Sequence, residues 1–412
     1  MSAAEDTKML KSTVAITYEL DDIQAGVSEL ADETLKNLTL QKNSFALLLC
    51  DSDVKHEEFV AELRRKLGVP IVGFSTTAMF SGGEGLCDGG AILTTVTSDD
   101  VNFSLATSEP LTPDNVAEEI EKTYKKALAG LDGAPELIMA FPPYILGIML
   151  DTYPREFSRV SGGVPIFGGL PAHDEVNGRS SVYCGDTASG NRVTALLLSG
   201  AVKPVMTVKN SLGSLANLKR TVTRSKDNVV YSVGDDTFVH FLEQFGLDVT
   251  KLANPEDKTT SFTTYPLLLE LANAQDLDGV PIVRTLHGVN LEDGSGTAIG
   301  EVPEGCTLSV GVLQPHDIDI STQNSTKDLI EKMKENERGG YRYSTVFAVS
   351  CVARYYVMAS KNTLEADALK KGLPPELSLS GFYSFGEICP TSVRSGKAAN
   401  AAHNESLVLL AL

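Results

Sequence analysis

A cysteine and an arginine three residues apart form a pair with clear chemical potential. Cys351 ends the apolar run 346–351, and Arg354 follows where we expect a helix to begin. A thiolate at such a junction is stabilised by the helix N-terminus and by a nearby guanidinium, which suits ligand contact, redox sensing or nucleophilic chemistry. The alternative interpretation is a small buried thiol, with Arg354 in a structural ion pair with Glu365.

Further polar side chains lie close to the end of the chain. Glu387 occupies a turn flanked by glycine, where a carboxylate can accept hydrogen bonds from a ligand amine or from the loop's own N–H groups. His403 and Asn404 precede the last apolar run and allow the same two interpretations, because asparagine often bonds loop backbone. Ligand contact and loop stabilisation both stay open for these positions.

The first half of the chain offers two polar loops that follow apolar runs. Ser75 and Thr76 could hold a ligand carboxylate through hydroxyl and backbone N–H groups, or could cap the following turn. His173 and Asp174, followed by Glu175, fill a similar loop later in the chain. Neither this cluster nor the polar stretch 316–319 has the spacing of a recognised metal motif. We therefore expect no metal ion and no cofactor.

Arg284 is a lone cation after an apolar run. Its guanidinium could clamp a ligand carboxylate through two parallel hydrogen bonds, and a salt bridge at the surface or between domains is the competing interpretation. The glycine-rich stretch 81–90 fits neither the dinucleotide motif nor the P-loop motif and precedes an expected strand, which indicates a mobile connection. The chain has no G-x-S-x-G elbow either.

An internal repeat positions these loops. Each of three copies contains an apolar strand, a helix, a second strand that ends near glycine, a loop and a final strand, and the copies span residues 45–96, 137–198 and 346–410. The first strand of each copy is continuously apolar, as expected when both faces of a sheet are covered. We therefore predict an α/β fold (mixed α+β) of mixed sheets flanked by helices, with ligand loops at the carboxyl ends of the strands.

The segment between the second and third copies has a different pattern. Its expected elements are one helix and three strands, over residues 238–245, 266–271, 280–284 and 307–312. A basic, polar stretch at 219–228 precedes them. We place a domain boundary near residue 230, which divides the chain into residues 1–230 and 231–412.

The composition restricts the classes of partner. The 412-residue chain has 54 acidic and 35 basic residues and a net charge of −19, which disfavours nucleic acid and anionic membranes because both need clustered Lys and Arg. It contains no apolar run of about eighteen residues and no visible secretory signal. None of the six cysteines forms a C-x-x-C pair, as is usual in a reducing compartment. We expect a cytoplasmic protein.

Several separated motifs resemble those of the FIST family. The stretch Gly381-Phe382-Tyr383-Ser384-Phe385-Gly386-Glu387-Ile388, followed by His403-Asn404 and an apolar strand, is similar to the end of a FIST C domain. Upstream similarities lie at Val283-Arg284, Val302-Pro303-Glu304-Gly305, Ser350-Cys351-Val352-Ala353-Arg354 and Glu365. The stretch Val72-Gly73-Phe74-Ser75-Thr76 resembles part of FIST N. Together the motifs cover almost the whole chain, in the order that the family has.

The resemblance implies an intracellular sensory protein that binds small molecules such as amino acids. In bacteria the family is often fused to signal-transduction outputs, and it also occurs in eukaryotic F-box proteins. No output segment follows the signature, so we expect a separate protein to carry the signal. We expect ligand contacts in a cleft between the two FIST domains, at Ser75, Thr76, His173, Asp174, Arg284, Cys351, Arg354, Gly381, Phe382, Tyr383, Glu387 and Asn404.

Two other functions stay open from the sequence alone. A cysteine-dependent enzyme would use Cys351 as its nucleophile and needs a base, for which the candidates are His173, His287 and His403. A protein–protein scaffold would need no ligand. We expect binding rather than catalysis, with a small molecule and a separate output protein as the partners.

Overall fold

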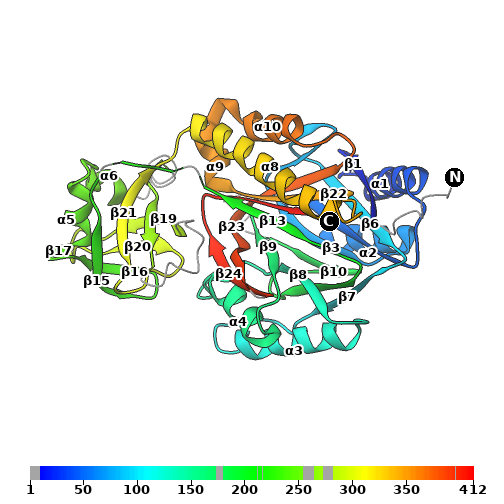
Figure 1. Cartoon of the computed structure of the whole chain (residues 1–412), viewed down its shortest axis with the longest axis horizontal. Helices are drawn as coiled ribbons and strands as arrows, with labels where there is room; N and C mark the ends of the chain where they lie inside the picture. Colours follow the sequence, from blue (N-terminus) through cyan, green and yellow to red (C-terminus); the bar gives the residue numbers. More distant parts are fainter. Residues whose placement is uncertain are drawn as a thin grey trace.

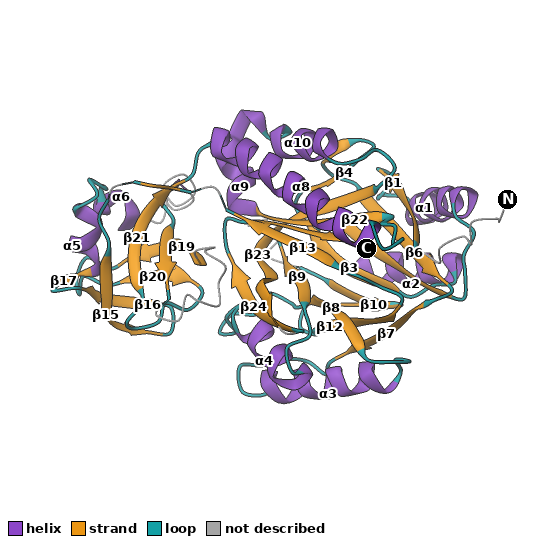
Figure 2. Ribbon diagram, viewed as in Figure 1, coloured by secondary structure: helices purple, strands orange, loops and turns teal. Residues whose placement is uncertain are grey.

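Two packed β-sheets with helices on their outer faces form the main body, and a β-barrel lies at one end of it (Figure 1). The computed structural model describes residues 10–172, 180–210, 212–215, 217–253, 264–271, 282–394 and 396–412. In Figure 2 the strands of the main body run between helices at the top and at the bottom. The fold is therefore mixed α/β with three sheets, one of which closes into a six-stranded antiparallel barrel.

The first sheet has six strands. Their order across the sheet is β1 (Lys11–Thr17), β6 (Ala91–Ser98), β2 (Asn43–Asp51), β3 (Ile71–Thr76), β10 (Val182–Gly185) and β11 (Thr187–Ser189). β2 and β3 are parallel, and the other neighbours are antiparallel. Strand β2 is buried because helices α1 (Ile23–Asn37) and α2 (His56–Leu67) cover one face and the second sheet covers the other.

The second sheet has eleven strands. Eight follow one another across it in the order β13 (Val205–Lys209), β25 (Leu407–Ala411), β22 (Thr345–Cys351), β23 (Ser378–Arg394), β9 (Ile166–Pro171), β8 (Pro135–Phe141), β12 (Thr194–Gly200) and β7 (Val101–Thr107). The other three, β4 (Met79–Ser81), β5 (Gly85–Cys87) and β24 (Lys397–His403), attach through β23. Strand β23 therefore contacts strands from every part of the main body.

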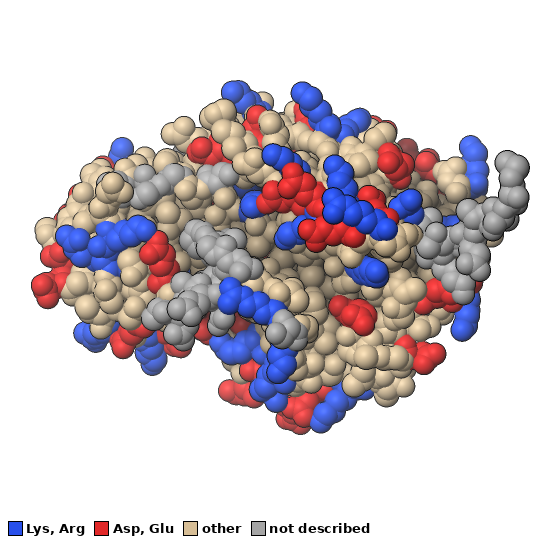
Figure 3. Space-filling model, in the orientation of Figure 1, with Lys and Arg blue, Asp and Glu red and all other residues tan. Residues whose placement is uncertain are grey.

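Helices cover the outer face of the second sheet in two groups. One group packs over β8, β9 and β12 and consists of α3 (Val116–Ala129) and α4 (Thr152–Ser161). The other packs over β22, β23 and β25 and consists of α8 (Pro315–Glu337), α9 (Val352–Met358), the short 3-10 helix η3 (Ala359–Lys361) and α10 (Leu364–Gly372). Figure 3 shows acidic and basic side chains interspersed over the α8 side of the molecule.

Aromatic and aliphatic side chains fill the space between the two sheets. The ring of Phe74 in β3 contacts Phe141 of β8 and Phe382 of β23, with centroids 5.0 and 4.9 Å apart. Successive residues of β22 alternate between this core and the helix-covered face, as Phe347 and Ala348 do. The alternation explains why the strand is apolar at every position.

The three copies of the sequence repeat have the same strand pairing. The first two strands of each copy are parallel and the last is antiparallel to the first, in the sets β2–β3–β6, β8–β9–β12 and β22–β23–β25. The first copy lies in the first sheet, whereas β9 and β23 join the second and third copies in the second sheet. Strands that are distant in the sequence are thus neighbours in the fold.

The region between the second and third copies forms the third sheet. Six strands close into the barrel, namely β21 (Thr307–Val312), β15 (Arg220–Lys226), β16 (Val229–Val233), β20 (Gly296–Ile299), β19 (Ile282–Val289) and β18 (Leu267–Glu270), and β14 (Gly213–Ser214) and β17 (Asp236–Thr237) pair at its margin. Helices α5 (Phe238–Glu243) and α6 (Val249–Ala253) contribute to its apolar interior. Residue 230 lies in β16, and β16 pairs with β15. The division into residues 1–230 and 231–412 stays a prediction.

Two local structures differ from the sequence-based expectation. The glycine-rich stretch 81–90 includes the turn and second strand of the β4–β5 hairpin, in which Gly85 adopts a φ of 82° that glycine tolerates. The pattern of the second copy also predicted a helix from about residue 144, but α4 begins at Thr152, and Gly147, at a φ of 90°, lies in the loop before it. Within the described residues, none of the helices has the length and apolar character needed to cross a membrane.

Candidate functional site

Polar side chains that are almost fully buried gather where β22 ends, beside the middle of β23 and the start of β25. Cys351, the last residue of β22, pairs with Ser384 of β23, and its N–H donates to the Ser406 carbonyl over 3.0 Å. Helix α9 follows Cys351 directly, as the sequence predicted. In Figure 1, α9 and β24 lie on the side of the main body that faces the barrel. We call this group the polar cluster; its members are Ser350, Cys351, Arg354, Glu365, Tyr383, Ser384, Glu387 and residues 403–406.

A buried ion pair joins α9 to α10. Arg354 donates from Nε to Glu365 Oε1 over 2.9 Å and also bonds this oxygen through Nη2, and both side chains are 0 % exposed. Ser350 donates to the second oxygen of Glu365 over 2.6 Å. The structural ion pair that competed with a ligand role for Arg354 is therefore present. Among the described residues, however, Nη1 of Arg354 has no hydrogen-bond partner.

Two glutamates lie near the Cys351 thiol. Glu387 accepts from the Ser384 hydroxyl over 2.9 Å and from the Ser406 N–H over 3.3 Å. Burial raises the pKa of Glu387 to about 8. Burial also raises the pKa of Glu405 well above its usual range, and the nearby Glu387 adds to this shift. Both shifts disfavour the ionised carboxylate.

The Cys351 thiol is also neutral. Its pKa is raised well above the ordinary value by burial first, and then by the acidic groups of Glu387 and Glu405. The sequence pattern suggested a thiolate stabilised by Arg354, but that guanidinium is bonded to Glu365. Of the two interpretations that the sequence left open for Cys351, burial and the paired arginine favour the small buried thiol.

Two residues of the barrel strand β19 contact the main body, one of them at the polar cluster and the other beside it. Arg284 donates to Asp151 Oδ1 over 2.6 Å, to the Ala402 carbonyl over 3.1 Å and to the Glu301 carbonyl over 3.0 Å. Its neighbour Thr285 donates to Glu405 Oε1 over 3.0 Å. Because Asp151 and Ala402 belong to the main body, Arg284 forms a salt bridge between the barrel and the body, which is the second of its two sequence-based interpretations.

The segment 403–406 carries further unusual features. His403 is fully buried, contacts the Cys389 carbonyl at 3.0 Å through Nε2, and has a pKa lowered to about 4 by burial. Oδ1 of Asn404, Nδ1 of His403 and Oε2 of Glu405 lack hydrogen-bond partners among the described residues. Glu405 also adopts a φ of 55°, a left-handed conformation that is strained for a residue with a Cβ. Strain and unpaired polar atoms thus coincide in one short segment.

Comparisons with known proteins decide the family. The model of the FIST N domain matches residues 44–236, and that of the FIST C domain matches residues 246–390. The chain belongs to the FIST family. No curated protein matches this FIST chain.

A solved structure gives a weaker likeness. The crystal structure of cyanuric acid hydrolase from A. caulinodans is 11% identical with a TM-score of 0.31, over 50% of this chain and 72% of that chain. A TM-score this low carries no conclusion about chemistry.

The FIST structure brings only some of the predicted site residues together. Arg354, Cys351, Tyr383, Glu387 and Asn404 belong to the polar cluster. Burial raises the pKa of the Tyr383 hydroxyl well above its usual value, with the charge of Glu365 as the next cause. These five positions come from three separate parts of the third copy, so the parallel pairing of β22 and β23 accounts for their proximity.

The other predicted positions lie beside the polar cluster or apart from it. Thr76 donates to the Tyr383 carbonyl over 2.9 Å, whereas Ser75 accepts from the Ser181 N–H over 2.7 Å. Phe382 packs in the core between the sheets, on the opposite face of β23. A Cβ added at Gly381 would lie 2.4 Å from the Phe80 ring, so this glycine serves packing. His173 and Asp174 lie outside the described residues.

Sequence reasoning missed several members of the polar cluster. Glu405, Ser350 and Ser384 are buried at the site. Asp151 of the main body and Thr285 of the barrel take part in the contacts that join the two parts. A usable signal exists for Ser350 and Glu405, because a hydroxyl inside an apolar strand and a carboxylate immediately before one both need buried partners. Asp151 gives no such signal, since its partner is 133 residues away.

Proposed function

We propose that this FIST protein is a sensory protein that binds a small amine-bearing ligand, such as an amino acid, at the polar cluster. The observation that carries the proposal is the set of buried polar atoms without described partners, on Arg354, Asn404 and Glu405. A buried polar atom left unpaired costs about 1–3 kcal/mol, more if charged. A ligand that supplies the missing partners would recover this free energy on binding.

The polar cluster offers complementary groups for both ends of an amino acid. Nη1 of Arg354 is a charged donor that suits a carboxylate. The carboxyl groups of Glu387 and Glu405 and Oδ1 of Asn404 are acceptors that suit an ammonium group. An ammonium group nearby favours the ionised carboxylate, so we expect binding to release a proton from one of the glutamates.

Thermal-shift measurements test the proposal directly. Each amino acid is compared with two analogues, the amine that lacks its carboxylate and the acid that lacks its ammonium group. Only the intact amino acid is expected to raise Tm strongly. Calorimetry in two buffers with different ionisation heats should then reveal release of up to one proton at pH 7. If no intact amino acid raised Tm, the proposed function would be wrong.

A conservative variant separates binding from folding. Glu405→Gln replaces a protonated carboxyl group with a neutral amide of the same shape, so the fold should persist while the variant cannot form a carboxylate. We expect at least a tenfold loss of affinity, about 1.4 kcal/mol or more. The control is Glu58→Gln, which removes an exposed carboxylate from the first turn of α2 and should leave affinity unchanged. Equal affinities of all three proteins would contradict the assignment of the site.

We also propose that the bound state is transmitted to a separate output protein. The support is the contact of Thr285 in the barrel with Glu405, because ionisation of Glu405 on ligand binding would alter the attachment of the barrel. A pull-down with and without the amino acid tests this, and retention of a partner must depend on the ligand. The neutral Cys351 thiol favours binding over the cysteine-enzyme alternative.

A further inference from the structure

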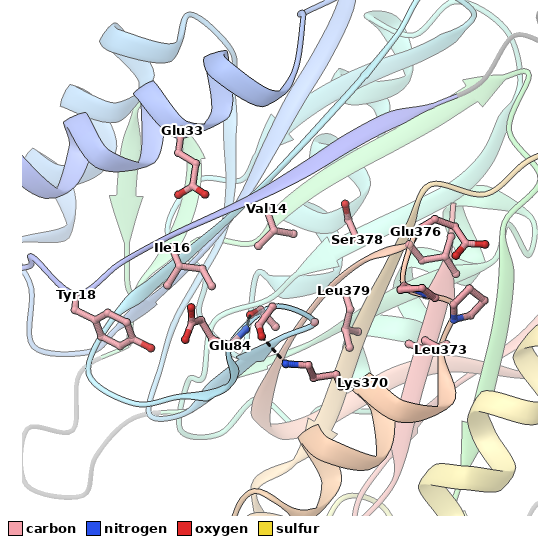
Figure 4. A pocket seen from close by; sticks show the side chains of 16 residues that line it. Val14, Ile16, Tyr18, Glu33, Glu84, Lys370, Leu373, Glu376, Ser378 and Leu379 are labelled. Atoms are coloured by element: carbon pink, nitrogen blue, oxygen red, sulfur yellow. Dashed lines mark hydrogen bonds between the residues drawn. The ribbon is translucent and has the colours of Figure 1, made fainter.

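A pocket lies at the outer edge of the first sheet, and none of its lining residues belongs to the polar cluster. Its volume is about 600 Å³, within the range of small-molecule sites. One wall is β1, which is the end strand of its sheet and pairs with β6 alone among the described strands. The loop 373–379 between α10 and β23 forms the facing wall, and the turn 82–84 of the β4–β5 hairpin closes one end (Figure 4).

The walls of this edge pocket are apolar. Val14 and Ile16 lie on the same face of β1 and are half-buried against the core between the sheets. Leu377 and Leu379 of the facing wall are buried beneath the pocket surface. Figure 4 shows Val14, Ile16 and Leu379 around the same space. An aliphatic or aromatic ligand body would therefore bury apolar surface on both sides.

The charged residues of the edge pocket are mainly acidic. Glu33, Glu84 and Glu376 line it, and Lys370 is the only cation among the described residues of its lining. The Lys370 ammonium donates to the Gly83 carbonyl over 2.6 Å, drawn as the dashed line in Figure 4. The described lining thus holds three carboxylates and one ammonium, and that ammonium already has a partner. Together with the net charge of −19, this arrangement raises the local concentration of cations.

A tyrosine at the mouth adds a second feature that suits a cation. Tyr18 directly follows β1, lines the edge pocket and is 53 % exposed. The face of its ring can attract an ammonium group, and its hydroxyl can donate or accept a hydrogen bond. In Figure 4 Tyr18 lies beside Glu84, so the aromatic and acidic groups are at the same end of the pocket.

We infer that the edge pocket binds a small organic cation, namely a primary amine on an apolar body of about six carbons. The ammonium group lies between Glu84, Glu33 and the Tyr18 ring, and the body lies between β1 and Leu379. This ligand differs from the proposed amino acid because the edge pocket has no unpaired cation for a carboxylate.

A fluorescent amine tests the inference on the full-length protein. Dansylcadaverine carries a primary amine and an apolar fluorophore, and the chain has no tryptophan whose emission would overlap with the excitation of the dansyl group. We expect the emission of dansylcadaverine to rise when it binds. Hexylamine should reverse this rise by displacing the probe, whereas hexanol and hexanoate should not. Competition by hexanol as strong as that by hexylamine would overturn the assignment of a cation. The assignment of a small organic cation would also be overturned if only an extended lysine-rich peptide, and not hexylamine, displaced dansylcadaverine.

Four variants locate the bound amine. Glu84→Gln and Glu33→Gln remove exposed charges and should each weaken hexylamine about 2- to 5-fold. Val14→Lys places an ammonium group inside the edge pocket and should weaken it more than tenfold, with an unchanged circular dichroism spectrum as the folding control. Glu405→Gln, in the polar cluster, should have no effect.

The exposed control Glu58→Gln separates a specific site from general attraction to an acidic protein. It should leave hexylamine affinity unchanged. A loss with Glu58→Gln equal to that with Glu84→Gln would mean that the amine binds the acidic surface at large, and the inference would be wrong. A loss with Glu405→Gln instead would assign the amine to the polar cluster, which contradicts the edge pocket while it supports the proposed function.

Discussion

The strand ends of the first and third copies share a backbone arrangement but differ in polar content. At the end of β2 and β3, Ser75 accepts from a backbone N–H and Thr76 donates to a carbonyl, so neutral side chains meet backbone partners. At the end of β22, beside the middle of β23, Arg354 and Glu405 are fully buried, and each keeps one atom without a described partner. The repeat therefore supplies the same backbone geometry in both copies, and the third copy adds buried charged residues to it.

The cysteines of the two copies sharpen the comparison. Cys50 in β2 and Cys351 in β22 are both buried, and burial raises the pKa of both thiols well above the usual value. Acidic neighbours add to the shift in each case, Asp51 for Cys50 and Glu387 for Cys351. A cysteine after an apolar strand is thus common to both copies and does not mark the site. The polar cluster of the third copy is distinguished instead by the neighbouring glutamates and by Arg354.

The largest expected effect comes from breaking the buried ion pair of the third copy. Glu365→Ala leaves Arg354 charged, buried and without its carboxylate, so we expect a loss of about 3–5 kcal/mol in the free energy of unfolding. Urea denaturation measures it. The control is Glu62→Ala in the first copy, which removes a half-buried partner of the exposed Arg65 and should have little effect. Similar losses for the two variants would mean that the contrast between the copies is wrong.

The second prediction concerns pH. A glutamate whose pKa is raised to about 8 in the folded state stabilises the fold fully below its unfolded pKa of about 4.3, and this stabilisation is lost as the pH rises through 8. Between pH 6.5 and 8 we expect a loss of about 2 kcal/mol from Glu387. His403, with a lowered pKa, acts in the opposite direction only below about pH 6.5.

Denaturation at several pH values checks this prediction. Glu387→Gln cannot ionise, so its stability should change less over the same interval. A first-copy variant such as Ser75→Ala should keep the slope of the parent protein, because it removes no titratable group. A flat profile for the parent protein would contradict the raised pKa of Glu387.

The third prediction compares two serines at corresponding strand ends. Ser75→Ala removes one acceptor for a backbone N–H and should cost about 1 kcal/mol at every pH. Ser384→Ala should cost a similar amount at low pH, but it also removes a donor that lowers the pKa of Glu387. Its cost should therefore grow as the pH rises. Parallel pH profiles for the two variants would contradict a role of Ser384 in the titration of Glu387.

The smallest expected difference is in thiol reactivity. Cys50 and Cys351 are both buried and protonated, so iodoacetamide should label neither at pH 8 before the protein unfolds. Cys184 is half-buried and should react first. Mass spectrometry after timed labelling measures the order. Rapid labelling of Cys351 alone would show that the two cysteines differ in reactivity and would favour the thiolate interpretation of Cys351.

Much of the fold could be predicted from the sequence because strand and helix patterns are local. The repeat predicted the strand–helix–strand units, and the start of a helix after Cys351 followed from the same pattern. Sheet membership could not be predicted, since the pairing of β9 with β23 joins residues more than two hundred positions apart. The closed barrel could not be predicted either, because its closure depends on the non-local pairing of β18 with β21.

The site was predictable to a smaller extent. Motifs located Arg354, Glu387 and Asn404, which lie in the polar cluster. They could not tell whether Arg354 would be paired, and the burial that neutralises Cys351 and the glutamates is a property of the assembled sheets and helices. Contacts such as that of Thr285 with Glu405 cross from the barrel to the body and leave no pattern in either segment.

Strand β23 has a consequence for how the chain folds. It pairs with β22 on one side and with β9 and the β4–β5 hairpin on the other, so it joins the two parts of the second sheet. During synthesis β9 emerges more than two hundred residues before this partner, and its edge and the apolar faces beside it stay uncovered until then. Loop closure over such separations is slow, so we expect late, chaperone-sensitive folding of the main body, with the locally paired barrel strands formed earlier.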